Sequence, residues 1–218
     1  MKKLILNVLA IATLAIGTIA CKGEKSNATA AKEVVTEVEA VKYKVDTEES
    51  VIVWTGFKPG ESHKGTLHLD SGVVKVGESI SGTFIIDMNS LAVTDLKPGE
   101  GKEGLEGHLK GTAKEKEDHF FNVAKFPTAA FEITGVSEKD GKKTMEGNLT
   151  IRGIKKNVSF PVSYKVNGDV MKLISEPFKI NRTDWGINYG SKSIFNDLGD
   201  KFIMDDIELK ISLKGSKA

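Results

Sequence analysis

The stretch TMEGNLTI, residues 144–151, decides the fold class of this chain. Its odd positions carry Met, Gly, Leu and Ile, whereas its even positions carry Thr, Glu, Asn and Thr. An alternation of period two places one set of side chains on each face of a β-strand, and a strand with one apolar face is typical of an antiparallel sheet. We therefore expect a half-buried strand here, with Met145, Leu149 and Ile151 facing the core.

The same alternation recurs on both sides of this stretch. Apolar or small residues stand at every second position in four further runs: Ile80, Gly82, Phe84, Ile86 and Met88; Phe131 and Ile133; Val158, Phe160 and Val162; and Ile207, Leu209, Ile211 and Leu213. Residues 70–72, 139–141 and 167–169 combine Gly with Asp and separate these runs as hairpin loops do. From about Tyr43 onward the sequence predicts an all-β fold, a single antiparallel barrel of about eight strands, because closure removes exposed strand edges.

One segment departs from the strand pattern. Residues 100–119 are rich in Glu and Lys and place Leu105, His108 and Leu109 at helical spacing. The spacing predicts one short helix over about 102–110, followed by a charged loop, although the glycines of the segment disfavour a helix.

The first residues have the features of an export signal. Lys2 and Lys3 precede an apolar core that is shorter than a membrane-spanning helix, and small residues precede Cys21. Residues 1–20 are therefore predicted to be a signal peptide. Residues 21–41 are small and charged without an aromatic residue, so we expect a flexible linker, in which a transient helix over 30–41 is left open.

Cys21 is the only cysteine, so no intramolecular disulfide can form. Small residues before a cysteine at this place resemble the lipobox of bacterial lipoproteins, which implies that Cys21 is lipidated and becomes the first mature residue. Thr18 stands where that motif most often has Leu, so cleavage near Ala20 with a free thiol is the alternative. We expect a periplasm-facing lipoprotein of the bacterial cell envelope, anchored in the outer membrane through Cys21.

Several consecutive segments resemble the YceI-like family of periplasmic, isoprenoid-binding, lipocalin-like proteins. They are WTGFKPGESHKGTLHL, GTFIIDMNSLAVTDL, LEGHLKG, HFFNVAKFPTAAFEITGV, GNLTIRGIKKNVSFPV and NRTDWGINYG. The resemblance covers nearly all of residues 42–215, while the stretch 111–118 looks longer than the corresponding connection of the family. It implies a lipocalin-like barrel domain over 42–218, with a helix packed by it and a long apolar cavity that holds a polyisoprenoid, such as a quinone precursor, or a related lipid.

The lining of such a cavity is expected among large apolar side chains in the middle of strands, since an isoprenoid chain gains about 25 cal/mol for each Å² removed from water. The candidate lipid-binding residues are Phe84, Ile86, Phe131, Ile133, Leu149, Ile151, Phe160 and Val162. Each of them could equally be ordinary core. Head-group contacts are assigned to His63 and Arg182; the alternatives are a surface histidine and a staple in which Arg182 and Asp184 fix a turn beneath Trp185.

Other classes of function find little support. The formal net charge is +1 with Lys and Glu interspersed, so the concentrated basic face that nucleic acid requires is absent. No nucleophile with a positioned base and no phosphate-binding loop is recognisable, so we expect no enzyme, although a hydrolase or isomerase that uses the cavity stays a weak alternative. The spacing of His63, His68, His108 and His119 does not suit a metal, so none is expected.

The sequence thus predicts a non-enzymatic carrier or store for a hydrophobic lipid, with no cofactor apart from a bound polyisoprenoid or quinone-like lipid. The alternative is a structural or stress-related envelope lipoprotein, whose barrel is filled by its own side chains and whose surface meets a protein partner. A homodimer is left open.

Overall fold

The computed structural model describes residues 27–34 and 39–218 of the chain. The elements in chain order are β1 Thr29–Ala30, β2 Val41–Val45, β3 Val51–Lys58, β4 Glu61–Val76, β5 Ile80–Val93, α1 Lys102–Lys110, β6 Thr128–Lys139, β7 Lys142–Ile151, β8 Ile154–Asn167, β9 Val170–Ser175, β10 Phe178–Asn181, η1 Arg182–Trp185, η2 Gly199–Lys201 and β11 Asp206–Lys217. The predicted signal peptide and Cys21 lie outside the described residues. Within the described part, no helix combines the length and the apolar character needed to cross a membrane.

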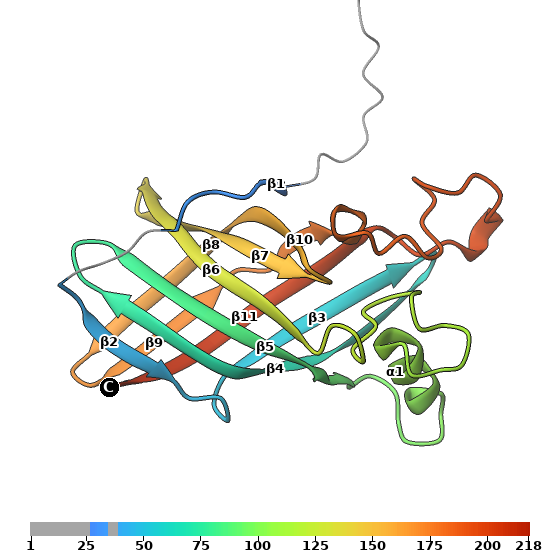
Figure 1. Ribbon diagram of the computed structural model, residues 1–218, viewed down its shortest axis with the longest axis horizontal. Helices are drawn as coiled ribbons and strands as arrows, with labels where there is room; N and C mark the ends of the chain where they lie inside the picture. The colour runs from blue at the N-terminus through green and yellow to red at the C-terminus, as the bar shows by residue number, and fades with distance from the viewer. Residues whose placement is uncertain (1–26, 35–38) are drawn as a thin grey trace, which may run out of the picture.

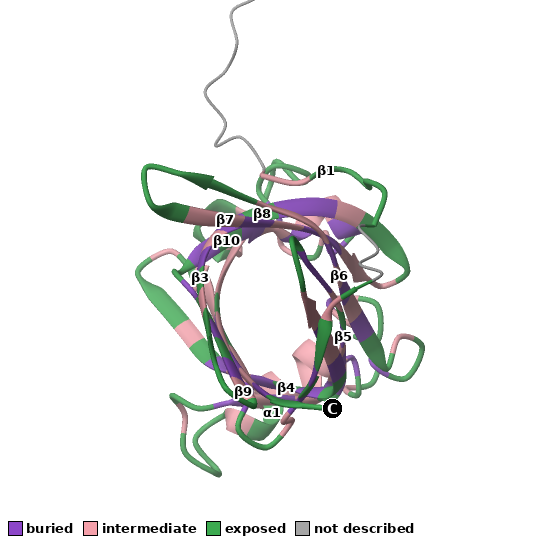
Figure 2. Cartoon of the chain, turned by 90° about the vertical axis from the view of Figure 1, so that its left-hand side faces the viewer, coloured by how far each residue is buried: buried purple, intermediate pink, exposed green. Residues whose placement is uncertain are grey.

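Eight of the strands close into an antiparallel ring. Each strand from β3 to β8 pairs with the next one, and β11 closes the ring by pairing with both β9 and β3. Figure 2 shows these strands on all sides of a central axis. The predicted antiparallel barrel of about eight strands with one short helix is confirmed, and the helix spans Lys102–Lys110.

Two positions in the ring are each shared by two short strands. Between β4 and β11, β3 pairs with residues 61–67 of β4 and β2 pairs with residues 73–76. On the other side of β11, β10 pairs with residues 206–209 and β9 with residues 212–216. The long strands β4 and β11 therefore run the length of the barrel, while their neighbours change at its middle (Figure 1).

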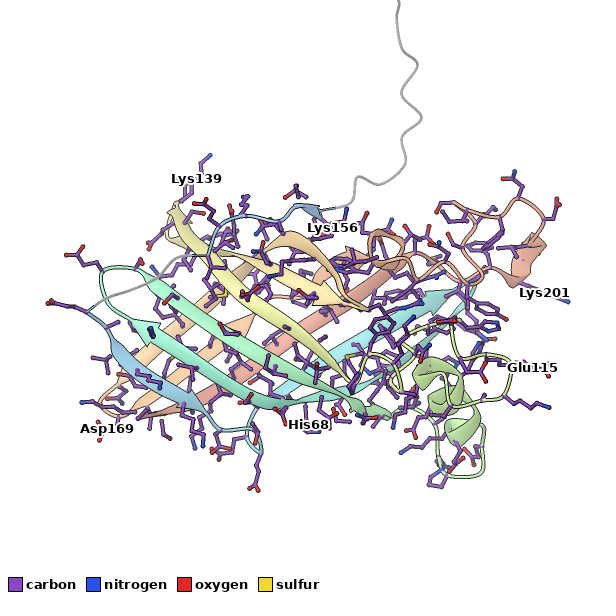
Figure 3. All side chains as sticks on the ribbon, viewed as in Figure 1. His68, Glu115, Lys139, Lys156, Asp169 and Lys201 are labelled. Atoms are coloured by element: carbon purple, nitrogen blue, oxygen red, sulfur yellow. The ribbon has the colours of Figure 1, made fainter. Side chains whose placement is uncertain are left out.

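The two ends of the barrel differ (Figures 1 and 3). One end, here called the turn end, carries tight connections between strands, and Lys139 lies there. The other, here called the α1 end, carries the helix and two long connections, residues 111–127 and 182–205, the second of which holds Lys201. Long connections at a barrel mouth are the usual place for ligand contacts.

Two of the three predicted hairpin turns are confirmed, and the third is wrong. Residues 139–141 join β6 to β7, and residues 167–169 join β8 to β9. Residues 70–72, by contrast, belong to β4, and the ladder to β5 shifts its register there. A β-bulge favours the same small and polar residues as a turn, so composition alone does not separate the two. The chain turns instead at residues 77–79.

Side chains fill much of the barrel interior. Four aromatic rings, from Phe84 through Phe131 and Phe160 to Phe178, follow one another with centroid separations of 6.2, 5.6 and 4.3 Å. Gly147 makes room for the ring of Phe131, because a Cβ at residue 147 would lie 2.1 Å from its Cζ atom. We call the buried residues around these rings the packed cluster: Tyr43, Val45, Leu69, Val74, Ile80, Phe84, Phe131, Ile133, Met145, Val158, Phe160, Val162, Met171, Leu173, Phe178, Ile180, Trp185 and Leu213.

Residues 27–34 lie against the outside of the barrel, over β7 and β8 (Figures 1 and 2). The two residues of β1 pair with Asn157 and Lys156 of β8. The Asn148 side chain accepts a hydrogen bond from the Lys32 N–H at 2.9 Å and donates one to the Lys32 carbonyl at 2.7 Å. A side-chain amide thus pairs with the backbone as a neighbouring strand would.

The predicted flexible linker over residues 21–41 is therefore wrong for this docked part, and β2 already begins at Val41. A helix over 30–41 is likewise not found at its start, since Ala30 belongs to β1. The physical reason lies in Asn148 and Asn157, which are only 1% and 2% exposed and need partners for their buried amides.

Replacing Asn148 by leucine is expected to release this segment. The substitution removes both hydrogen bonds to Lys32 and one from Asn157, whose Nδ2 donates to Asn148 at 3.2 Å. Each of the two bonds to Lys32 contributes about 1 kcal/mol, so tryptic cleavage after Lys32 should become about thirtyfold faster. Asn89, exposed on β5, supplies the control: equal cleavage rates in Asn148→Leu and Asn89→Leu would contradict the docking role.

Candidate ligand-binding cavity

A cavity of about 290 Å³ lies inside the barrel at the α1 end. Side chains from β3, β4, β5, β6, β7, β10 and β11 form its wall, and α1 with the two long connections covers it. Nearly all of the lining is apolar; the charged or titratable side chains among the described lining residues are Lys58, His63, Arg182 and Asp206. The volume is at the lower end of the range of small-molecule sites.

Five of the predicted site residues line this cavity. They are the lipid-binding candidates Ile86, Leu149 and Ile151 and the head-group candidates His63 and Arg182. They come from β4, β5, β7 and η1, so the barrel brings together residues that are far apart in the sequence.

The other five candidates lie outside this lining. Phe84, Phe131, Ile133, Phe160 and Val162 belong to the packed cluster. Alternation identifies the inner face of a strand, but it does not tell how deep along the barrel a residue lies. Contact of these five with a lipid stays a prediction, and a ligand chain that reached them would have to displace packed rings.

Several lining residues were missed by the sequence-based candidates. The strands contribute Trp54, Leu67, Met88, Leu91 and Leu209, and the connections contribute Phe120 and Phe121. Leu105 and Leu109 of α1 also line the cavity, and their helical spacing was a usable signal, because it marks the face of the helix that packs on the barrel.

An aromatic cluster joins the parts that close the α1 end. His108 of α1 lies 2.8 Å from His119, measured from Nε2 to Nδ1, and the His119 ring stacks on Tyr189 at a centroid separation of 3.8 Å. Phe120, which lines the cavity, packs edge-on against His108 at 5.1 Å. We call α1, residues 111–121 and residues 186–205 together the cover, because these rings connect all three.

Acidification is expected to weaken the cover. Burial and the neighbouring charges of Lys116 and His119 lower the pKa of His108, so the folded state favours its neutral form. The unfolded chain then takes up the proton first, and the contribution to stability, complete above a pH of about 6.5, is lost as the pH falls below it. Melting temperatures measured across this range should fall less steeply for His108→Phe, which keeps the ring; parallel slopes for the two proteins would overturn the assignment.

Arg182 is buried between η1 and the end of the long connection. Its guanidinium donates to the carbonyls of Ile187 at 2.6 Å, Ile203 at 3.0 Å and Met204 at 3.1 Å. Asp205 supplies the carboxylate beside it, at 3.5 Å, in place of the predicted Asp184. Two roles were predicted for Arg182, a structural staple and a head-group contact. These contacts correspond to the staple, although the side chain also borders the cavity.

His63 faces the cavity from the inner side of β4. Its Nδ1 lies 3.0 Å from the Asp95 carboxylate, which also accepts a hydrogen bond from the Lys64 amide at 3.2 Å. Burial raises the pKa of Asp95, but the hydrogen bonds from His63 and Lys64 outweigh burial and lower it overall. Asp95 is therefore ionised at neutral pH and acts only as an acceptor.

Trp54 forms the wall next to His63. Its indole lies over Gly65, where a Cβ would come within 2.5 Å of the ring. The Nε1–H is buried and has no hydrogen-bond acceptor among the described residues. Trp185, the other tryptophan, belongs to the packed cluster and donates to the Leu149 carbonyl at 3.1 Å. Among the described residues no group of three or more His, Cys, Asp or Glu could hold a metal ion.

Residues 43–215 match the YceI-like domain. This chain belongs to the YceI-like family. Curated relatives named Protein YceI, from Salmonella arizonae and Salmonella newport, are each 26% identical to it over 143 residues, which is 63% of this chain and 71% of theirs. The sequence resemblance to the family is thus confirmed, and family membership supports the binding of an apolar ligand.

Two solved structures share the fold of this YceI-like chain. Burkholderia cenocepacia BcnA superposes with a TM-score of 0.59 at 21% identity, covering 78% of this chain and 98% of its own. A polyisoprenoid binding domain from Saccharophagus degradans superposes with a TM-score of 0.56 at 12% identity, covering 83% of this chain and 100% of its own. At these identities the likeness shows a shared fold.

Proposed function

We propose that this YceI-like chain binds an isoprenoid-like or other long-chain lipid in the cavity at the α1 end of its barrel. The observation that carries the proposal is the cavity itself, an almost wholly apolar space inside a closed ring of strands. Such a space gains free energy only from an apolar occupant, at about 25 cal/mol per Å². Family membership and a structural neighbour described as a polyisoprenoid binding domain support the same ligand class.

The proposal treats the protein as a carrier or store without catalytic activity. The polar groups at the cavity are engaged in structural contacts: Arg182 with three carbonyls and His63 with Asp95. A nucleophile beside a positioned base, which acyl transfer would need, is not part of the described lining.

We further propose that the protein is exported to the cell envelope and anchored in the outer membrane through lipidated Cys21. The sequence of residues 1–21 supports this placement. A Cys21→Ala variant is expected to leave the membrane fraction, whereas retention as firm as that of the wild type would exclude Cys21 as the attachment point.

Extraction of the native protein tests the ligand directly. The protein is purified from its own host without lipid-like detergent, extracted with organic solvent, and the extract is analysed by mass spectrometry. We expect one class of long-chain, apolar molecule at a constant ratio to protein. Repeated recovery of empty protein that also fails to take up prenols or quinones would reject the carrier role.

The alternative of a barrel filled by its own side chains applies to part of the barrel only. The packed cluster fills much of the interior, whereas the α1 end retains the cavity, and Ile180 belongs to both. A protein partner and a homodimer remain predictions from the sequence.

A further inference from the structure

We propose that the cavity selects a ligand whose apolar chain ends in a neutral hydroxyl group, which donates its proton to Nε2 of His63. This proposal rests on the proposed lipid binding and adds the chemistry of the head group. It follows from the hydrogen bond between His63 and Asp95 at the cavity wall, and from the pairing of the charged groups around the cavity.

The hydrogen bond to Asp95 decides which His63 nitrogen carries the proton. Asp95 is ionised and can only accept, so the contact of 3.0 Å requires a proton on Nδ1 of His63. In a neutral imidazole the other nitrogen, Nε2, is then an acceptor. A neutral His63 therefore offers the cavity an acceptor at Nε2, whose natural partner is an O–H group.

Trp54 lies in the same part of the wall. In the ladder between β3 and β4, Trp54 pairs with Gly65 and Gly56 pairs with His63, so Trp54 and His63 are diagonal neighbours on the inner face. The Trp54 Nε1–H is buried without an acceptor among the described residues, and native proteins rarely leave such a donor unpaired. Because the Nε1 atom itself has almost no accessible surface, the indole borders this part of the cavity with its apolar ring, and the polar contact is left to His63.

The charged groups around the cavity do not favour an anionic head group. Lys58 pairs with Glu61 at 2.8 Å, and Arg182 is held by backbone carbonyls and Asp205. Asp206, which also lines the cavity, is paired with Lys179 at 3.4 Å. The Lys58–Glu61 pair is exposed and contributes little. A phosphate group inside the cavity would have to break the buried contacts of Arg182 or enter an apolar wall without a counter-ion, and either costs free energy.

A matched set of ligands tests the proposal on the full mature chain. The probes are farnesol, its methyl ether, the hydrocarbon farnesene and farnesyl diphosphate, each measured by displacement of an apolar naphthylamine dye. We expect farnesol to bind about tenfold more tightly than the methyl ether, which cannot donate, or farnesene. Farnesyl diphosphate is expected to bind no more tightly than farnesene. Comparing the affinities of a phenol and an aliphatic alcohol that carry equal chains shows which of these two kinds of hydroxyl the cavity binds.

Two variants assign the preference to residues. His63→Phe keeps an aromatic ring without nitrogens and should erase the difference between farnesol and its methyl ether, while farnesene affinity changes less than about twofold. Asp95→Asn should reduce the preference, because an amide no longer fixes the Nδ1 proton. His68, exposed on the outside of β4, supplies the control variant His68→Phe (Figure 3).

The outcomes distinguish the proposed hydroxyl site from the underlying proposal that the cavity binds a lipid. If none of the four probes displaces the dye, lipid binding itself is rejected. If farnesene and farnesol bind equally well, or if His63→Phe retains the full preference for farnesol, the cavity still binds lipids but the hydroxyl site is wrong. Tightest binding of the diphosphate would overturn it as well.

Discussion

Replacing Arg182 by leucine is expected to destabilise the barrel by about 3–5 kcal/mol, a large part of the stability of a typical domain. The side chain is 2% exposed, and its loss leaves the carbonyls of Ile187, Ile203 and Met204 without their donor. Leucine keeps much of the apolar volume, so the measured change in the free energy of unfolding reports mainly the lost polar contacts. Urea denaturation provides the measurement.

Two further variants show that the guanidinium matters and not the positive charge alone. Arg182→Lys keeps the charge but cannot reach three carbonyls in a planar arrangement, so it should recover less than half of the loss. Lys179→Leu removes an exposed cation that pairs with Asp206 at 3.4 Å, and it should change the stability by less than about 1 kcal/mol. A loss for Arg182→Leu as small as that for Lys179→Leu would contradict the staple.

Replacing Gly56 by phenylalanine is expected to weaken ligand binding by at least about thirtyfold, because the new ring would occupy space that the apolar chain needs. Gly56 lines the cavity on β3, and a Cβ placed there would meet nothing within 4 Å. The substitution therefore fills the cavity without a clash near the backbone. Phenylalanine also suits a strand better than glycine, so stability should not fall.

Gly135 on β6 supplies the matched control, since a Cβ there also meets nothing within 4 Å but the residue does not line the cavity. Dye displacement should be normal in Gly135→Phe. Unchanged binding in Gly56→Phe would place the ligand elsewhere in the protein. Gly65 shows the opposite behaviour: a Cβ there would lie 1.8 Å from the Ala92 carbonyl oxygen, so the closeness of two backbones requires glycine.

Local patterns predicted the strands, the helix and the barrel because those features depend on neighbours in sequence. Met145 and Ile133 face the core as the alternation of their strands requires, and α1 follows the spacing of Leu105 and Leu109. The bulge in β4 escaped prediction, since its Asp, Ser and Gly suit a turn equally well.

The position of the cavity along the barrel could not be predicted from the same patterns. Phe131 and Ile151 both face inward, yet the first packs against other rings and the second lines the cavity. That difference depends on the cover, which brings Phe120 and Tyr189 together from separate connections. The docking of Lys32 on Asn148 is also held by side-chain contacts across 116 positions of sequence, which no local period reveals.

The docking of Lys32 on Asn148 limits how far the barrel can lie from its point of attachment. With Cys21 as the proposed attachment point, a fully extended chain from Cys21 to Lys32 reaches at most about 40 Å. Without this docking, the extended chain from Cys21 to Val41 would reach about 70 Å. A barrel with so short a tether would take up and release its lipid close to the membrane that carries it. Substitution of Asn148 would free the tether and let the barrel reach farther from that membrane.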